Sequence, residues 1–186
     1  MNKAFLYGCI ALILYGSSLL VPSTQQVAYE QALRPSVATA QIEAPPAVVP
    51  ASMEITNIRL KAKLTPLTLS SDRTLPVPKD PFAVGWYNAT GPLVLVGHYD
   101  SPTDVAVFYN LKKLKSGEMV SVTSSDGAIS SYTIDKVASY PIAKFPTQEV
   151  YNAGSDQLRL LTCAGTFNHK TNRYSHNLVV FATRNK

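Results

Sequence analysis

The hydrophobic positions of this 186-residue chain change their pattern twice along its length. Residues 4–21 form one uncharged, mostly apolar run. Residues 22–52 show no hydrophobic period and consist largely of Ala, Pro, Gln, Ser and Val. From Met53 onward, short apolar segments alternate with turn-forming residues to the end of the sequence. This pattern predicts three parts: residues 1–21, 22–52 and 53–186.

The first part is about as long as a helix that crosses a membrane, which needs roughly 20 apolar residues. A cleaved signal peptide is one interpretation, because residues 16–18 are small. We favour an uncleaved signal-anchor, because the apolar run continues through residues 19–21. Lys3 precedes the run and the next basic residue is Arg34, so the positive-inside rule places the rest of the chain outside the cell. We therefore expect a single-pass protein of the cell membrane with an extracytoplasmic C-terminal domain.

The second part is expected to be a tether. Its prolines, among them Pro45, Pro46 and Pro50, exclude a regular helix and favour a partly extended, polyproline-like chain. Such a segment would hold the third part clear of a membrane surface.

The third part has the pattern of a mostly β domain. Asp126-Gly127 supplies the dihedral angles of a tight hairpin turn between two apolar segments. Residues 105–114 predict one short helix, residues 75–81 an irregular wall segment, and residues 139–157 a long loop with at most one helical turn. The expected strands are residues 55–60, 62–69, 83–87, 93–98, 118–123, 129–138, 158–163 and 177–183. Eight strands with little helix indicate a closed or nearly closed β-barrel.

Charge narrows the classes of function. The chain has 17 Lys and Arg against 12 Asp and Glu, which gives a formal net charge of +5. The basic residues are scattered and not gathered in a stripe, and aromatic residues are not interleaved with them. These features argue against nucleic acid as a partner.

Cys163 is the candidate nucleophile. It is the only cysteine outside the apolar N-terminal run, which contains Cys9. A lone thiol at a strand end is usually a small buried hydrophobe, but exported domains tend to pair their cysteines, so an unpaired one indicates chemistry. A thiol also needs a base or an electropositive neighbour to react at neutral pH, because its ordinary pKa is about 8.5.

Two further side chains supply the rest of a nucleophilic site. His98 ends a continuous apolar strand, and it would face Cys163 if the two strands are parallel neighbours. Arg173 lies in a predicted polar loop over 164–176 and could fold back over the thiol as an oxyanion donor. The backbone N–H groups of Ala164 and Gly165 could donate to the oxyanion as well.

No metal or cofactor is expected. His169 and His176 lie in the polar loop, but they lack a Cys, Asp or Glu at ligand spacing. Two acids in residues 139–157 are too few for a calcium site. Asp100 and Asp104, in the loop after the histidine strand, are interpreted as solvated acids.

Several short motifs resemble those of one enzyme family. They are GWY at residues 85–87, LVGHYDS at 95–101, VFYNLKKLKSGE at 107–118, FPTQEVY at 145–151, LRLLTCAGTF at 158–167 and NLVVFA at 177–182. On these motifs the chain resembles the sortases, the cysteine transpeptidases of Gram-positive envelopes, and most of all their class F. The likeness spans about residues 55–183, and the anchor and tether match the family's layout.

The resemblance implies an eight-stranded sortase barrel with one or two short helices, preceded by an N-terminal membrane-spanning helix. It implies that His98 is the general acid and base, that Cys163 forms an acyl-thioester, and that an arginine clamps the oxyanion and the substrate. Thr162 would support the substrate carbonyl or the hydroxyl network of the site. The expected substrate is an LPXTG-like sorting signal of a surface protein, cleaved between Thr and Gly. The expected acceptor is an amine of a peptidoglycan precursor or a pilin lysine.

The position of the arginine departs from the family pattern. In many sortases it directly abuts the last strand, where this chain has residues 175–177. Arg173 is the nearest arginine and the one we favour. Arg159 is the alternative, because period-two alternation puts it on the face of the thiol, although it lies roughly 13 Å away along the strand. His176 or Asn177 taking over part of the donor role is a third alternative.

Two other functions fit the same residues. A thiol hydrolase or endopeptidase would use water as the acceptor on the same scaffold. A tethered, non-catalytic β-barrel would bind envelope components without thiol chemistry.

Overall fold

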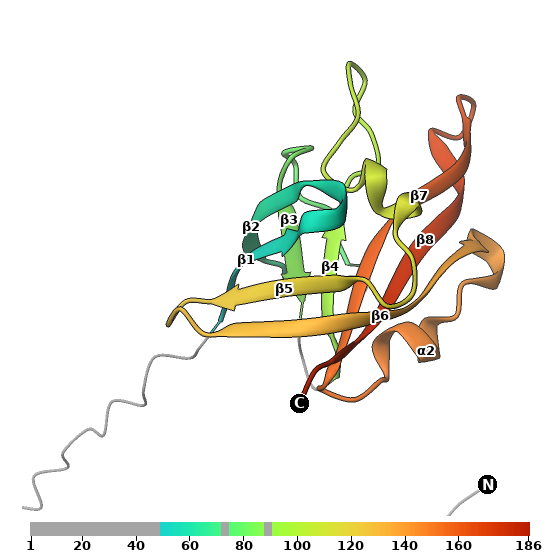
Figure 1. Cartoon of the computed structure of the whole chain (residues 1–186). Helices are drawn as coiled ribbons and strands as arrows, with labels where there is room; N and C mark the ends of the chain where they lie inside the picture. Colours follow the sequence, from blue (N-terminus) through green and yellow to red (C-terminus); the bar gives the residue numbers. More distant parts are fainter. Residues whose placement is uncertain (1–48, 72–74, 88–90) are drawn as a thin grey trace, which may run out of the picture. The chain divides into compact units, whose positions relative to one another are not determined.

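The computed structural model describes residues 49–71, 75–87 and 91–186, and strands make up about half of this part of the chain. The strands are β1 (Pro50–Ile55), β2 (Leu60–Pro66), β3 (Val84–Tyr87), β4 (Leu93–Gly97), β5 (Met119–Ser124), β6 (Ile129–Pro141), β7 (Gln157–Asn168) and β8 (Arg173–Arg184). They close into a barrel in the order β1-β2-β3-β4-β7-β8-β6-β5 (Figure 1). The prediction of a mostly β, eight-stranded barrel is confirmed.

The helical elements are short and lie between strands. They are η1 (Thr56–Ile58), η2 (Tyr109–Lys113), η3 (Ile142–Lys144) and α2 (Thr147–Tyr151). The predicted membrane-spanning helix and most of the predicted tether fall outside the described residues. Within the described ranges, no helix combines the length and the apolar character needed to cross a bilayer.

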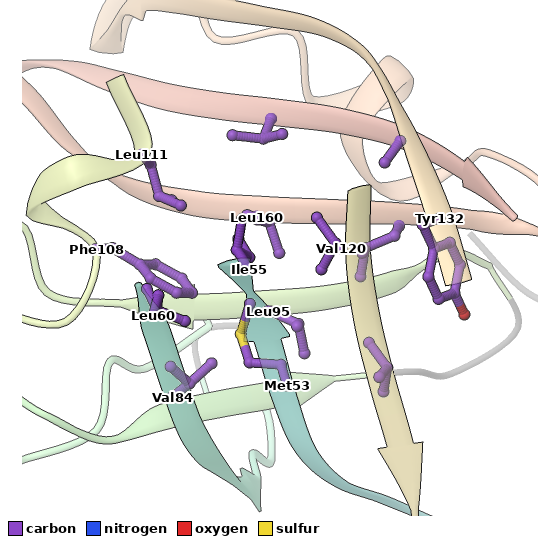
Figure 2. Close-up of a cluster of buried hydrophobic side chains, with 14 of the residues drawn as sticks. Met53, Ile55, Leu60, Val84, Leu95, Phe108, Leu111, Val120, Tyr132 and Leu160 are labelled. Carbon is purple, nitrogen blue, oxygen red and sulfur yellow. The ribbon is translucent and has the colours of Figure 1, made fainter. Parts of the chain in front are cut away.

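The barrel interior is filled by side chains that alternate along the strands. Leu95 of β4 and Leu160 of β7 are fully buried there (Figure 2). Val180 of β8 belongs to the same cluster. Phe108 and Leu111, from the connection between β4 and β5, pack into this core as well. Truncating a fully buried leucine or phenylalanine costs about 2–5 kcal/mol of folding free energy. This core therefore fixes the strands whose outer face carries the candidate site.

A second apolar layer lies outside the barrel. Val150 of α2 is fully buried and packs with Val179 and Phe181 of β8. These two β8 residues alternate with Leu178 and Val180, which belong to the interior core. The α2 segment therefore lies against the outer face of β8 and can wall a groove there.

Two pairs of neighbouring strands are parallel, β2 with β3 and β4 with β7. The register of the second pair runs from Leu93 opposite Leu158 to Val96 opposite Leu161. Parallel neighbours run toward the same edge of a sheet, so the residues that follow β4 lie beside the C-terminal half of β7. The sequence prediction for the histidine and the cysteine requires this arrangement.

Several element boundaries differ from the sequence prediction. The predicted strand over 55–60 is the end of β1, a 3-10 turn and the start of β2, because Arg59 adopts a left-handed backbone with φ 53°. β1 begins at Pro50, so residues 50–52 belong to the barrel and not to the tether. The predicted helix over 105–114 is reduced to η2, a 3-10 helix of five residues.

The largest difference concerns the predicted polar loop over 164–176. β7 runs on to Asn168 and β8 starts at Arg173, so the two strands form a long hairpin beyond the thiol. Gly165 lies at a register shift in this hairpin and has a positive φ of 81°. Most side chains of the hairpin are exposed on both faces, so no hydrophobic period marks it, while backbone hydrogen bonds hold it together.

Candidate active site

His98 and Cys163 follow two parallel neighbouring strands and face a groove on the outer side of the barrel. The last pair in the parallel register is Val96 with Leu161, and His98 and Cys163 each lie two residues further on. Both residues line the same groove, which has a volume of about 850 Å³. The structure therefore places His98 and Cys163 in one groove.

The groove has an apolar floor and two walls. Val94, Val96 and Leu161 form the floor, because they alternate with core residues of β4 and β7 and so point outward. The connection from β2 to β3 supplies one wall, and the segment from η3 to α2 supplies the other. The apolar wall residues are Leu69, Leu75, Val77, Ile142, Phe145 and Tyr151. An extended peptide with apolar side chains fits a groove of this chemistry.

The irregular wall segment predicted over 75–81 holds His98. The Nε2 atom of His98 lies 2.6 Å from the carbonyl oxygen of Pro78. A carbonyl oxygen only accepts hydrogen bonds, so Nε2 carries the proton, and the neutral ring keeps its lone pair on Nδ1. This contact fixes both the tautomer and the orientation of the imidazole.

The environment of Cys163 disfavours its thiolate form. The side chain is half-buried and forms no disulfide. Burial raises the pKa of the thiol, and the negative charge of Asp100 raises that pKa further. Because the thiolate is the reactive form, a base within the site has to remove the proton as the reaction proceeds.

Two polar residues stand beside the thiol in the groove. Asn177 of β8 is the cross-strand partner of Cys163 and also lines the groove. Thr162 lines it as well, is 3% exposed, and has a hydroxyl without a hydrogen-bond partner among the described residues. Leaving a buried hydroxyl unpaired costs free energy. Thr162 alternates with Leu161 and Cys163 along β7, so its side chain lies on the interior face with Leu160. The Asn177 side chain, which shares the outer face with Cys163, is therefore the one available to hydrogen-bond to a molecule bound in the groove.

Ala164 and Gly165, the other residues predicted to contact substrate, lie at the register shift of β7. Neither is among the residues that line the groove. A Cβ at position 165 would lie 2.4 Å from the Ser175 Oγ and 2.6 Å from the His176 Nδ1. Glycine is therefore required at position 165 on steric grounds, because a side chain there would prevent the close approach of β8 to β7.

The structure does not bring Arg173 to the groove, which corrects the sequence prediction. Arg173 is exposed and pairs with Asn168 near the tip of the β7–β8 hairpin. It lies four residues before Asn177 on β8, roughly 13 Å along the strand at about 3.3 Å per residue. The segment expected to fold back over the thiol is instead a β-hairpin, and Arg173 lies near its tip.

Arg159, the alternative arginine, is also engaged elsewhere. It is 4% exposed, and its guanidinium carbon lies 4.8 Å from the centre of the Phe181 ring. Its Nη1 donates to the Gln157 Oε1 at 3.2 Å and to the Leu158 carbonyl oxygen at 3.0 Å. Among the described residues, no arginine lines the groove.

Asp100 is not the solvated acid that the sequence suggests. It is half-buried, and its Oδ2 accepts a hydrogen bond from the Tyr174 hydroxyl. Burial and this carboxylate both raise the pKa of Tyr174. The hydrogen bond ties the loop after His98 to β8, and no signal in the sequence pairs two positions that are 74 residues apart.

The two remaining histidines lie outside the groove. The His169 ring packs edge-on against Phe167 at a centroid distance of 5.0 Å, and the His176 Nδ1 lies 2.7 Å from the Ser175 Oγ. In the part of the chain that the structure describes, no three His, Cys, Asp or Glu side chains gather as metal ligands would.

Comparisons with known proteins point to one family. A family model described as a sortase domain matches residues 53–185. The comparison with curated protein sequences gives no match. Sortase C1 of Streptococcus agalactiae is similar in structure, with a TM-score of 0.53 and 21% identity over 73% of this chain and 67% of that one. The lid mutant of sortase A from Corynebacterium diphtheriae has a TM-score of 0.55 and 22% identity over 89% of this chain and 81% of that one. At these identities the solved structures establish the fold.

Proposed function

The chain belongs to the sortase family of cysteine transpeptidases, because the family model covers residues 53–185, and on this premise we propose how its groove transfers an acyl group. Cys163 is the nucleophile, His98 is the general acid and base, and the groove binds the peptide that is cleaved. The observation that carries the proposal is the placement of His98 and Cys163 in one groove, across the parallel pair of β4 and β7.

The acyl donor in this proposal is an LPXTG-like sorting signal of a surface protein. The apolar floor of Val94, Val96 and Leu161 favours the leucine and proline of such a signal in an extended conformation. The groove ends at His98 and Cys163, so the threonyl carbonyl that is attacked lies at that end.

In the first half-reaction the Cys163 sulfur attacks the threonyl carbonyl carbon. The thiol proton passes to the Nδ1 lone pair of His98 as the C–S bond forms, since the Pro78 carbonyl already occupies the other ring nitrogen. His98 then gives a proton to the departing amine as the peptide C–N bond breaks. The products are a threonyl thioester on Cys163 and a free amine on the released fragment.

Asn177 is the oxyanion donor in this proposal, in place of the arginine that the family pattern suggests. Its side-chain amide has two N–H donors, and it stands directly across from Cys163 in the β7–β8 register. The Thr162 hydroxyl is not a second donor, because its side chain lies on the interior face of β7, opposite to the face of Cys163. Removing one oxyanion donor typically slows an enzyme by about 10²–10³-fold.

In the second half-reaction an amine attacks the thioester. The new C–N bond forms as the C–S bond breaks, and the Cys163 thiolate regains a proton. The acceptor that we propose is an amine of a peptidoglycan precursor or a pilin lysine. Water in the same role would make the protein a hydrolase.

We further propose that the protein belongs to class F and is anchored in the cell membrane with its catalytic domain outside. The motifs at 95–101 and 145–151 support the class. The apolar run over 4–21 with Lys3 ahead of it supports the anchor and its orientation, and residues 22–49 supply a tether.

Mass spectrometry of the full chain in detergent, after exposure to an LPXTG-type peptide, tests the acyl donor. We expect an adduct on Cys163 whose mass ends at the threonyl group, and none on Cys163→Ala. Absence of the adduct from a wild-type thiol that still reacts with iodoacetamide would refute the proposal.

Adding glycinamide to the same reaction separates the alternatives. A peptidyl amide product supports a transpeptidase, whereas a free acid at every amine concentration identifies a hydrolase. A thiol that resists alkylation, together with a Cys163→Ala variant that keeps every measured function, would favour a non-catalytic binding barrel.

A further inference from the structure

A half-buried carboxylate lies just beyond the end of the groove. The groove follows the outer face of β4 from Pro92 to His98, and Asp100 comes two residues after that end. The hydrogen bond from Tyr174 to Asp100 reaches across β7, which lies between β4 and β8 in the barrel. Asp100 therefore stands on the far side of the histidine and the thiol from the surface that binds the acyl donor.

This carboxylate has no cationic partner in the described part of the chain. The salt bridges there join Lys61 to Glu54 and Lys136 to Glu149. The Asp100 Oδ2 accepts from the Tyr174 hydroxyl, and the other oxygen has no hydrogen bond to a described residue. A half-buried negative charge with a free oxygen favours a cation that arrives from outside.

A neighbouring ammonium group is already engaged. The Lys112 Nζ lies 2.7 Å from the Tyr99 hydroxyl and 3.9 Å from the centre of the Tyr109 ring. The Tyr99 ring in turn packs edge-on against Tyr174 at 5.6 Å. This end of the barrel therefore binds one ammonium through tyrosines and leaves the carboxylate beside it open.

The first half-reaction gives no reason for an acid at this position. The charge of Asp100 raises the pKa of the Cys163 thiol and so reduces the thiolate that attacks the peptide. The second substrate of a transpeptidase is an amine, which is protonated at neutral pH when it is an ordinary α-amine or lysine. A carboxylate beside the thioester concentrates such a cation where it reacts.

We propose that Asp100, positioned by Tyr174, forms the subsite that binds the ammonium group of the acceptor amine. The inference rests on the proposed transpeptidase function and adds the charge state of the second substrate and the side from which it enters.

The ammonium donates a hydrogen bond to the free oxygen of Asp100. Before attack it loses one proton to His98, which passes the proton to solvent. The nitrogen lone pair then forms the amide bond as the C–S bond breaks, and the second nitrogen proton goes to the Cys163 thiolate. The acceptor thus enters from the end of the groove opposite the sorting signal.

The test measures how the acyl-enzyme partitions between water and two kinds of amine. Glycinamide is mostly cationic at pH 7, because α-amines have a pKa of about 7.7–8.0, whereas hydroxylamine is uncharged there. The wild-type full chain is compared with Asp100→Asn, and with Asp104→Asn as a matched acid from the same loop. Product ratios by mass spectrometry depend on deacylation alone, so an altered rate of acylation does not affect them.

We expect Asp100→Asn to raise the glycinamide concentration for half-maximal transfer by about threefold to tenfold. The ratio of hydroxamate to acid product should stay within about twofold of wild type, and Asp104→Asn should match wild type with both amines. Equal losses with glycinamide and hydroxylamine would overturn the inference, because they would indicate general damage to the site. No change with either amine would overturn it as well.

A second variant covers the case in which Asp100→Asn fails to fold. Tyr174→Phe removes the hydrogen bond that positions the carboxylate and keeps its charge, so the same selective loss with glycinamide is expected. Proportional losses with both amines in that variant would again overturn the subsite. A wild-type protein that forms no thioester at all would instead defeat the proposed function, and the subsite with it.

Discussion

Replacing Asn177 by alanine is expected to slow acylation by about a hundredfold, because it removes the proposed oxyanion donor. Replacing Arg173 by alanine is expected to change the rate by less than about twofold, because an exposed charge far from the reacting atoms contributes little. The two variants therefore give opposite outcomes for the two candidate donors.

The magnitude follows from where each side chain lies. Asn177 faces Cys163 across the β7–β8 register, and opposite residues of an antiparallel pair have Cα atoms about 4.5–5.5 Å apart, within reach of a carbonyl bound to the sulfur. The loss of such a donor costs about 2.7–4 kcal/mol, and we take the lower end because Asn177 is only half-buried and water partly replaces it. Arg173 is exposed and begins roughly 13 Å away along β8.

The assay is the initial rate of cleavage of a fluorogenic sorting peptide, from which kcat/KM is obtained for each variant. Asn177→Asp serves as the matched control, since it keeps the shape of the side chain and removes the N–H donors. We expect both Asn177 variants to lower kcat more than they raise KM, because the oxyanion exists only in the transition state. A hundredfold loss in Arg173→Ala, with near wild-type rates in Asn177→Ala, would show that the assignment is wrong.

Three further outcomes test the structure. Asp100→Asn removes a negative charge that raises the pKa of the Cys163 thiol, so this pKa should fall. The midpoint of iodoacetamide alkylation should then move to lower pH. An unchanged or higher midpoint would contradict the electrostatic interaction between Asp100 and the thiol. Phe108→Ala empties a fully buried core position and should lower the free energy of unfolding in urea by about 3–5 kcal/mol. Phe82→Ala, at a side chain that is 62% exposed, should change it by less than about 0.5 kcal/mol. Equal losses in the two variants would contradict the burial of Phe108 in the core. Gly165→Ala should cost at least about 1–2 kcal/mol, because it forces a side chain into a left-handed backbone and against β8, and a wild-type melting temperature would disprove that contact.

The barrel, and the placement of His98 and Cys163 in one groove, could be predicted because buried strands leave a strong record in the sequence. β4 is buried at all five positions and appears as a continuous apolar run that ends in Gly97. The first half of β7, up to Thr162, is also mostly buried, although Gln157 and Arg159 interrupt its apolar residues. Each of these two strands is followed by a reactive side chain. If the strands are parallel neighbours, their C-terminal ends lie at the same edge of the sheet, and so do the two side chains.

The sequence could not predict Asn177 as the candidate oxyanion donor or Asp100 as a half-buried carboxylate, for two different physical reasons. The hairpin that carries Arg173 is exposed on most of both faces, so its strands are held by backbone hydrogen bonds that no side-chain period reveals. The pairing of Asp100 with Tyr174 is a contact between distant side chains, and it depends on how the loop after β4 crosses the sheet. Only the register of β7 with β8, which the sequence does not state, places Asn177 opposite the thiol.

The parallel pairing of β4 with β7 ties chemical competence to the completion of folding. The imidazole at 98 and the thiol at 163 are 65 positions apart, and β5, β6 and α2 all form in the interval between them. Long-range pairings of this kind are slow to form and come together only when the loop between them has closed. A molecule that stalls before β7 docks is therefore inert toward peptide bonds, so the return of peptide cleavage during refolding reports the closure of the barrel itself.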